Sequence, residues 1–426
     1  MNEKNYIRYR KLKAFGNSLC FYLCRIFPIR KNLISVCTFE GKGGFGCNPK
    51  YVVEELHRRN PNYRFVWFVN DMQKPFPDYV KKVPNTLWSR AYWLSVSKIW
   101  IDNYRKPLGT RKRKGQYYLN TNHYTIGFKN VGLWRGNTFS KMAYLVSKSD
   151  SEMTDDVVID SKWCEEVLPK GLVYEGSFLK TGAPRCDVLF GDRGERKKHF
   201  REMYNLPVDA KLVMFAPTFR EGAKDGKRFV FSETWSLDFE RLLNSLEKRF
   251  GGKWYLCLRL HPQLAAQMQN HGKNDSVIQK LKNRIVDVSW QPDMHENLAA
   301  MDAYITDYSS AAMDAVLTGM PVFLYADDLK QYVADRGGLM WHIPIESGKP
   351  IVSDDAIAKG IHAVLPFVAS QDNDELEKEI LQFDETEYEK RIAAYKDAVG
   401  IVFDGGASGR IADCLGKILC EKRKRQ

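Results

Sequence analysis

The chain alternates short apolar runs, rich in β-branched and aromatic residues, with longer amphipathic stretches. This alternation is typical of strands joined by helical crossovers, so it predicts parallel sheets with helices on both faces. The runs expected to form strands are 33–39, 64–69, 98–102, 117–120, 157–160, 178–182, 212–216, 254–259, 285–287, 303–306 and 322–325. Helices are expected at 91–96, 196–204, 238–249 and 309–317, and another should open at Asn48 with Pro49 in its first turn.

The 426 residues are enough for two α/β domains with substantial cores. A charged segment, 191–201, follows a Pro184 turn and indicates the boundary between them. We expect four parts: a basic amphipathic segment at 1–30, a first domain at 31–195, a second at 196–385, and C-terminal helices with a basic tail at 386–426 that pack back across both domains.

The net charge of +13 favours nucleic acid or an anionic membrane surface as a partner. The first thirty residues interleave basic with aromatic and aliphatic side chains, a pattern typical of a helix in the plane of a membrane interface. Packing of this segment on the protein's own body is the alternative. No apolar stretch reaches the ~18–20 residues needed to span a bilayer. Because we find no recognition helix, zinc finger or aromatic RNA-binding motif, nucleic acid is not expected.

Nine cysteines, an odd number, are scattered without a metal-ligand spacing, which indicates reduced thiols in a cytoplasmic protein. The sole Asp-x-Asp pattern, 372–374, is predicted to be a solvated loop rather than a metal site. No metal or other cofactor is expected, because basic residues and helix ends can neutralise an anionic ligand.

Polar clusters follow several of the expected strands, where α/β proteins bind ligands. His123 comes just after 117–120 in a polar loop, where an imidazole stays accessible for proton transfer, although a lone histidine is often structural. Arg185 lies on a rigid turn, and a guanidinium suits bidentate phosphate contact. Arg259 and His261 follow another strand and, if extended, point to the same side.

The run 303–314 predicts a buried strand that stops at two hydroxyls, Ser309 and Ser310, before a helix that carries Asp314. A helix start offers unpaired N–H groups and a positive dipole end, both of which favour phosphates. Asp314, about one turn into the helix, could bind a sugar hydroxyl. An ordinary serine N-cap produces the same pattern.

Taken together, these clusters resemble the CDP-glycerol glycerophosphotransferase family, the enzymes of teichoic-acid and related polyol-phosphate polymers. The motifs that carry the resemblance are Gly-x-Pro-Arg-x-Asp at 182–187, Ala-Pro-Thr-Phe-Arg at 216–220, Arg-Leu-His-Pro at 259–262 and Thr-Asp-Tyr-Ser-Ser at 306–310. The resemblance implies two Rossmann-like domains of GT-B type with a cleft between them, the first on the acceptor side and the second holding the nucleotide donor. It also implies a peripheral location at the cytoplasmic face of the cell membrane.

The resemblance implies roles for individual residues. His123 would be the general base, with His261 as a second catalytic residue. The donor would be bound by Arg185, Pro217, Thr218, Arg259, His261, Ser309, Ser310 and Asp314, and the acceptor-side loop would comprise Asn122, Tyr124, Thr125 and Lys129. The family's Gln-Thr-Trp-His-Gly signature is kept at Thr121 and His123 but departs at Asn122 and Tyr124.

The implied reaction is transfer of a polyol phosphate, glycerol phosphate first, from CDP-glycerol or a related CDP-alcohol to a hydroxyl of a lipid-linked glycan or polymer, with release of CMP. Three alternatives stay open: a CDP-ribitol-type phosphotransferase, a GT-B glycosyltransferase using a nucleotide sugar, and a catalytically inactive protein of an assembly complex, which the departures at Asn122 and Tyr124 suggest.

Overall fold

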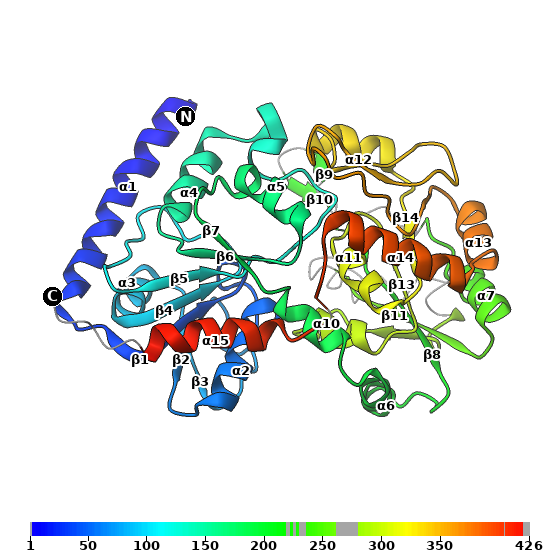
Figure 1. Ribbon diagram of the computed structural model, residues 1–426, viewed down its shortest axis with the longest axis horizontal. Coiled ribbons are helices and arrows are strands. Elements are labelled where there is room, and N and C mark those ends of the chain that lie inside the picture. Colours follow the sequence, from blue (N-terminus) through cyan, green and yellow to red (C-terminus); the bar gives the residue numbers. More distant parts are fainter. Residues whose placement is uncertain are drawn as a thin grey trace. The chain divides into compact units, whose positions relative to one another are not determined.

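The computed structural model describes residues 2–218, 222–224, 227–229, 236–260, 280–403 and 405–420 (Figure 1). The chain forms two compact units, and each is built from more than one segment. The first unit comprises Met1–Thr125, Val131–Asp187 and Phe403–Gln426, and the second comprises Ile126–Asn130 and Val188–Val402. The sequence placed the change of domain at 195/196, which lies inside the second unit.

The first unit contains a seven-stranded parallel sheet in the order β3-β2-β1-β4-β5-β6-β7. Its strands are β1 (Arg30–Cys37), β2 (Arg64–Val69), β3 (Val80–Pro84), β4 (Ser97–Asp102), β5 (Tyr117–Asn120), β6 (Asp156–Ile159) and β7 (Ser177–Lys180). β3 is the one strand of this sheet that the sequence did not predict. It lies at the edge, where Lys81 and Lys82 interrupt the apolar pattern, and lysines are common on edge strands.

Helices cover both faces of this sheet. The helices of the unit are α1 (Glu3–Leu23), α2 (Cys47–Arg59), α3 (Leu87–Val96), α4 (Lys141–Ser151), α5 (Lys162–Leu172) and α15 (Ala407–Cys420). Ile34 and Val36 of β1 belong to a core with α2 and α15, whereas Leu33 and Cys37 belong to a core with α1 and α3. This alternation follows the two-residue period of a strand. Figure 1 shows α15 running beside α2, as their packing requires.

The basic segment near the start forms α1, which Asn2 caps by accepting from the backbone N–H of Asn5 at 2.9 Å. Within the described residues, no helix has both the length and the hydropathy to cross a bilayer. The basic cluster at 111–114 is only partly solvated, because Arg113 donates to the carbonyl of Phe27 at 2.7 Å and to that of Ser95 at 3.1 Å. Arg113 therefore ties this loop to the chain that follows α1.

The second unit contains a six-stranded parallel sheet in the order β12-β11-β8-β13-β14-β17. Its strands are β8 (Lys211–Phe215), β11 (Trp254–Leu258), β12 (Ile285–Asp287), β13 (Ala303–Thr306), β14 (Val322–Tyr325) and β17 (Ala369–Ser370). Two short antiparallel pairs join β9 (Gly222–Lys224) to β10 (Lys227–Phe229) and β15 (Trp341–His342) to β16 (Val352–Ser353).

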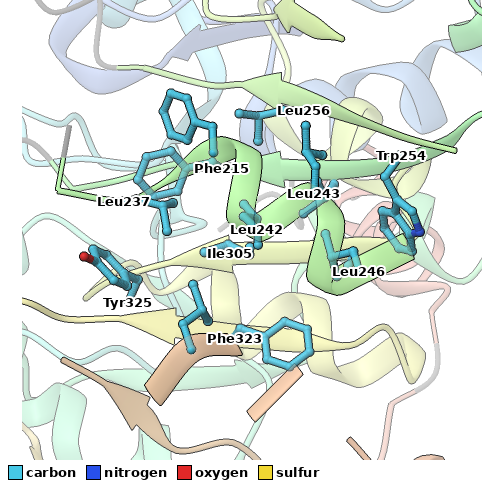
Figure 2. Packing of buried hydrophobic residues seen from close by; sticks show 14 of the residues in the cluster. Phe215, Leu237, Leu242, Leu243, Leu246, Trp254, Leu256, Ile305, Phe323 and Tyr325 are labelled. Atoms are coloured by element: carbon cyan, nitrogen blue, oxygen red, sulfur yellow. The ribbon is translucent and has the colours of Figure 1, made fainter. Parts of the chain in front are cut away.

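Among the described residues of the second unit, the helices are α6 (Arg193–Met203), α7 (Phe239–Phe250), α10 (Met294–Ala299), α11 (Ala311–Ala315), α12 (Leu329–Arg336), α13 (Asn373–Leu381) and α14 (Glu385–Val399). The described part of the chain also contains the short 3₁₀ helices η1 (Cys24–Ile26), η2 (Phe39–Gly41), η3 (Gly132–Thr138), η4 (Pro184–Leu189) and η6 (Val316–Thr318). Figure 2 shows Leu242 and Leu246 of α7 lying on Phe215, Trp254 and Ile305 of the sheet. The segment 372–374 is no loop: Asp372 is the N-cap of α13 and accepts from the N–H of Glu375 at 2.9 Å.

Both sheets share one strand order. Counted along its own unit, each sheet reads 3-2-1-4-5-6, the doubly wound order, and the first sheet adds one more strand. The direction of winding reverses between β1 and β4 in the first sheet and between β8 and β13 in the second. Ligands of doubly wound proteins bind beyond the carboxyl ends of the strands at this reversal point. Each unit therefore has one such edge where a ligand is expected to bind.

Candidate functional site

His123 lies at the reversal point of the first sheet. Its Nδ1 atom is 2.9 Å from the carbonyl oxygen of Asn103, the residue that directly follows β4. The ring centroid of Phe39, just beyond β1, is 5.5 Å away, and those of Tyr104 and Tyr124 are 5.4 and 4.9 Å away. Because a carbonyl oxygen only accepts, Nδ1 carries the proton and the basic lone pair is on Nε2. In this tautomer Nε2 is the ring nitrogen that can accept a proton.

The two departures from the family signature have different effects on the loop. Asn122 is in the left-handed region, with φ of 52°, which asparagine tolerates better than most residues. Its Oδ1 accepts from the N–H of His123 at 2.8 Å, and its own N–H donates to Oδ1 of Asn120 at 2.8 Å. Tyr124 has no positive φ, so the backbone does not need glycine there. Its ring lies edge-on against the imidazole, and burial raises the pKa of its hydroxyl. Thr125 is buried next to it.

Asn48 holds the His123 loop in place, and the sequence did not indicate this role. Its side chain is fully buried; Nδ2 donates to the carbonyls of Thr121 and Asn122, both at 2.8 Å, and Oδ1 accepts from the N–H of Arg185 at 2.9 Å. The sequence pattern predicts that a helix starts at Asn48, but α2 begins at Cys47 and its N-cap is Gly46. Asparagine near a helix start is common as a cap, so no local signal separated the two roles.

Arg185 belongs to the first unit, where it lies on the turn after β7. The resemblance grouped it with donor-binding residues that are mostly in the second domain. Its side chain is only 1% exposed. Through its backbone N–H and Asn48, Arg185 is tied to the loop that carries His123.

In the second unit, the reversal point is closed by hydrogen bonds between the ends of β8 and β13. The N–H of Thr218 donates to both carboxylate oxygens of Asp307, at 2.8 and 2.9 Å, and the hydroxyl of Thr306 donates to the carbonyl of Ala216 at 2.6 Å. Pro217 lies between these contacts. Asp307, which is buried, also accepts from the N–H of Tyr308 at 2.6 Å. Asp307 is part of the motif at 306–310, but the motif did not predict this structural role.

Ser309 and Ser310 are half-buried on the turn that follows. Oγ of Ser309 accepts from the N–H of Ala311 at 3.4 Å, and Ser310, the N-cap of α11, makes no capping hydrogen bond with its side chain. The helix expected at 309–317 is shorter, since α11 ends at Ala315 and continues as η6. Asp314 is buried, and its Oδ2 is 2.9 Å from Nε2 of His295 on α10, so one of its oxygens already has an internal partner.

Arg259 follows β11 and is mostly buried. Its Nη1 donates to the carbonyls of Val288 and Gln291, both at 2.7 Å, and burial lowers the pKa of its guanidinium. Arg259 therefore braces the loop after β12 in addition to any ligand contact. His261, predicted as its companion, lies outside the described residues.

The short segment Ile126–Asn130 belongs to the second unit, although both of its flanks belong to the first. The N–H of Met340 donates to the carbonyl of Phe128 at 2.8 Å, and Lys129 forms an antiparallel bridge with Leu339. A β-carbon placed on Gly127 would be 3.6 Å from that of Ser310. Lys129, assigned to the acceptor-side loop, is thus bound to the unit that carries the two serines.

A family model described as CDP-glycerol:poly(glycerophosphate) glycerophosphotransferase matches residues 19–417. The chain belongs to this family. The resemblance inferred from the motifs is confirmed, and so is the α/β class with parallel sheets.

Among its relatives is a teichoic acid poly(glycerol phosphate) polymerase of Staphylococcus epidermidis, 26% identical over 397 residues, which cover 90% of this chain and 51% of the relative. A teichoic acid poly(ribitol-phosphate) polymerase of Bacillus spizizenii is 26% identical over 77% of this chain and 50% of the relative. The chain thus spans about half the length of these curated relatives. The solved structure of the wall teichoic acid polymerase TagF is 24% identical, with a TM-score of 0.75 over 98% of this chain and 99% of that chain, and this likeness shows a shared fold.

Proposed function

We propose that the protein transfers a polyol phosphate, glycerol phosphate first, from a CDP-activated donor to a hydroxyl group and releases CMP. The observation that carries the proposal is the contact of His123 with the Asn103 carbonyl, which sets its tautomer for proton acceptance at the reversal point of the first sheet. Family membership supplies the donor class. Polar groups of the family motifs, Thr218 and Ser309 to Ser310, lie at the matching point of the second sheet.

In this reaction Nε2 of His123 takes the proton from the acceptor hydroxyl as its oxygen attacks the phosphorus that bears the polyol. A bond forms between the acceptor oxygen and phosphorus, and the bond to the bridging oxygen breaks, so that CMP leaves with the electron pair. Phosphoryl transfer of this kind depends mainly on positioning and on stabilisation of charge. The protein would bring the acceptor to His123 and the donor to the serine turn.

We expect the purified protein to release CMP from CDP-glycerol when a lipid-linked polyol-phosphate primer is present, and to leave UDP-sugars intact. The assay is chromatographic separation of the nucleotide products, with mass spectrometry of the lengthened acceptor. Ser310→Ala should raise the KM for the donor, whereas Thr318→Ala, a hydroxyl on η6 outside the proposed site, should not. Release of UDP from a UDP-sugar would replace the proposal with a glycosyltransferase.

CDP-ribitol is the second candidate donor, and the relative named as a poly(ribitol-phosphate) polymerase favours its inclusion. The same assay compares the two CDP-alcohols at equal concentration. Binding of either donor without turnover on any primer would point instead to an inactive member of an assembly complex.

We also propose that α1 lies in the interface of an anionic membrane, at the cytoplasmic face, where a lipid-linked acceptor would be reached. The helix packs Ala14, Ser18 and Phe21 on its own unit. Its opposite side exposes apolar residues at spacings of three and four, and the side chain of Leu12 is 72% exposed. Ile26, just beyond the end of the helix, is 80% exposed. This exposed side comprises Leu12, Phe15, Leu19, Tyr22, Leu23 and Ile26. The two interpretations of this segment, packing on the protein and lying in a membrane interface, are thus compatible, because one face of α1 packs on its unit and the other is exposed.

Replacing Leu12 and Phe15 together with glutamate should weaken binding to phosphatidylglycerol vesicles by at least tenfold. Burying a side chain of this size contributes about 1.5–3 kcal/mol, and each carboxylate adds repulsion from the anionic lipids. Flotation or cosedimentation measures the binding. Val208→Glu, at an exposed apolar residue of the second unit, is the control and should bind like the parent protein. Equal binding of all three proteins would contradict a role for α1.

A further inference from the structure

We infer that Lys106 is a positioning residue for His123: its buried ion pair with Asp102 fixes the turn 102–106, whose Asn103 carbonyl holds the imidazole in its proton-accepting tautomer. This inference deepens the proposed function and rests on it. Lys106 does not touch the imidazole, and we assign it no contact with substrate.

The ion pair lies at the exit of β4. Nζ of Lys106 contacts Oδ2 of Asp102, and the two side chains are 4% and 3% exposed. Charges so far from water persist only when they are paired and hydrogen-bonded. Burial raises the pKa of the Asp102 carboxyl, and the ammonium of Lys106 opposes this shift. The other oxygen of Asp102, Oδ1, accepts from the N–H of Tyr104 at 3.0 Å, so the carboxylate also shapes the turn itself.

Hydrogen bonds also fix the C-terminal end of the turn, at Lys106. The N–H of Lys106 donates to Oδ1 of Asp150 on α4 at 2.8 Å, and the hydroxyl of Tyr118 donates to the same oxygen at 3.1 Å. Burial raises the pKa of Asp150 to about 7. The neighbouring cation, Arg105, points elsewhere and donates to the hydroxyl of Ser147 at 2.6 Å. Lys106 therefore contacts both buried carboxylates, Asp102 through its ammonium and Asp150 through its backbone N–H.

Two consecutive carbonyls of this turn bind the loop that carries His123. The carbonyl of Asp102 accepts from the N–H of Thr121 at 2.7 Å and from its hydroxyl at 3.1 Å. The next carbonyl, that of Asn103, is 2.9 Å from Nδ1 of His123. The side chain of Asn103 is itself fixed, because its Oδ1 accepts from the N–H of Phe39 at 2.8 Å. A shift of the turn would weaken the bond to Nδ1 and allow the proton to move to Nε2, which cannot then act as a base.

The test removes both charges at once, so that neither is left buried alone. Asp102→Asn combined with Lys106→Met approximately conserves volume, and such replacements of buried pairs are often tolerated. Thr121→Val is a second, milder variant that keeps the ion pair and removes one hydrogen bond to the turn. The control is Lys197→Met, which breaks a half-buried ion pair with Asp302 in the second unit.

Three readouts separate positioning from general damage. With CDP-glycerol and primer, kcat of the double variant should fall about 10–100-fold while KM for the donor stays within about twofold. The acidic limb of the pH–rate profile should move to lower pH, because a bond from Nδ1–H to a carbonyl stabilises the imidazolium and its loss lowers the pKa of His123. Nitrogen-15 NMR of the histidine side chains should change from one tautomer to a mixture. Thr121→Val should change all three in the same direction by less, and Lys197→Met should change none.

The NMR measurement needs no turnover, and His123→Gln assigns its signal. If the parent protein holds His123 in the Nδ1–H tautomer and Thr121→Val or the double variant loosens it, the positioning inference stands even when no CDP-alcohol is consumed, in which case only the proposed function fails. A lower kcat with an unchanged pH profile and an unchanged tautomer would overturn the inference and leave Lys106 with a purely structural role.

Discussion

Replacing His123 with alanine is expected to lower the turnover of CDP-glycerol by about 10²–10⁴-fold, the usual contribution of a well-placed general base. The KM for the donor should change little, because the groups proposed to bind the donor do not include the imidazole. Initial rates of CMP release at saturating donor measure the first quantity, and their dependence on donor concentration measures the second.

His362→Ala is the matched control, since this histidine is 80% exposed in the second unit and should be replaceable without effect. If the His123 variant lost donor affinity and rate in equal measure, the residue would be a phosphate ligand instead of a base. If it kept full activity, the proposed mechanism would be wrong at its central step.

Replacing Asn48 with alanine is expected to lower the free energy of unfolding by about 3 kcal/mol or more. The change removes three buried hydrogen bonds and leaves two carbonyls and the N–H of Arg185 without their partner. Each buried group that loses its partner costs about 1–3 kcal/mol. Urea unfolding followed by tryptophan fluorescence measures the loss.

The same variant should lose activity even at urea concentrations at which it is still folded, because Asn48 joins the loop of His123 to the turn of Arg185. Asn32→Ala provides the comparison, since the side chain of Asn32 is exposed and donates to the carbonyl of Asn62. A loss of stability no larger than that of Asn32→Ala would show that the loop does not depend on the buried amide.

The strands were predictable where local pattern alone determines them. β2, β5, β12, β13 and β14 begin and end at the predicted residues, because buried parallel strands are short, apolar and bounded by polar residues. β3 was not predicted, because two lysines interrupt its apolar pattern at the edge of the sheet. The helix after Ser310 was predicted too long, because periodicity does not show that α11 tightens into a 3₁₀ turn.

The site was predictable to the extent that its motifs follow strands, since the end of a strand in a parallel sheet is a known ligand position. What the sequence could not show is pairing over long separations. Asn48 and Arg185 are 137 positions apart, and a polar residue that will be buried looks like any other polar residue. The ion pair of Asp102 and Lys106 was missed for a related reason: a spacing of four is usually interpreted as a pair on the surface of a helix.

The segment Ile126–Asn130 has a practical consequence for engineering. Because the chain leaves the first unit at residue 126, returns at 131, and comes back a second time at 403 to contribute α15, neither unit is a contiguous fragment. A truncation after Asp187 would deprive the first core of Ile411 and Leu415. A chimera that exchanges the second unit between two family members would therefore have to transplant 126–130 along with 188–402.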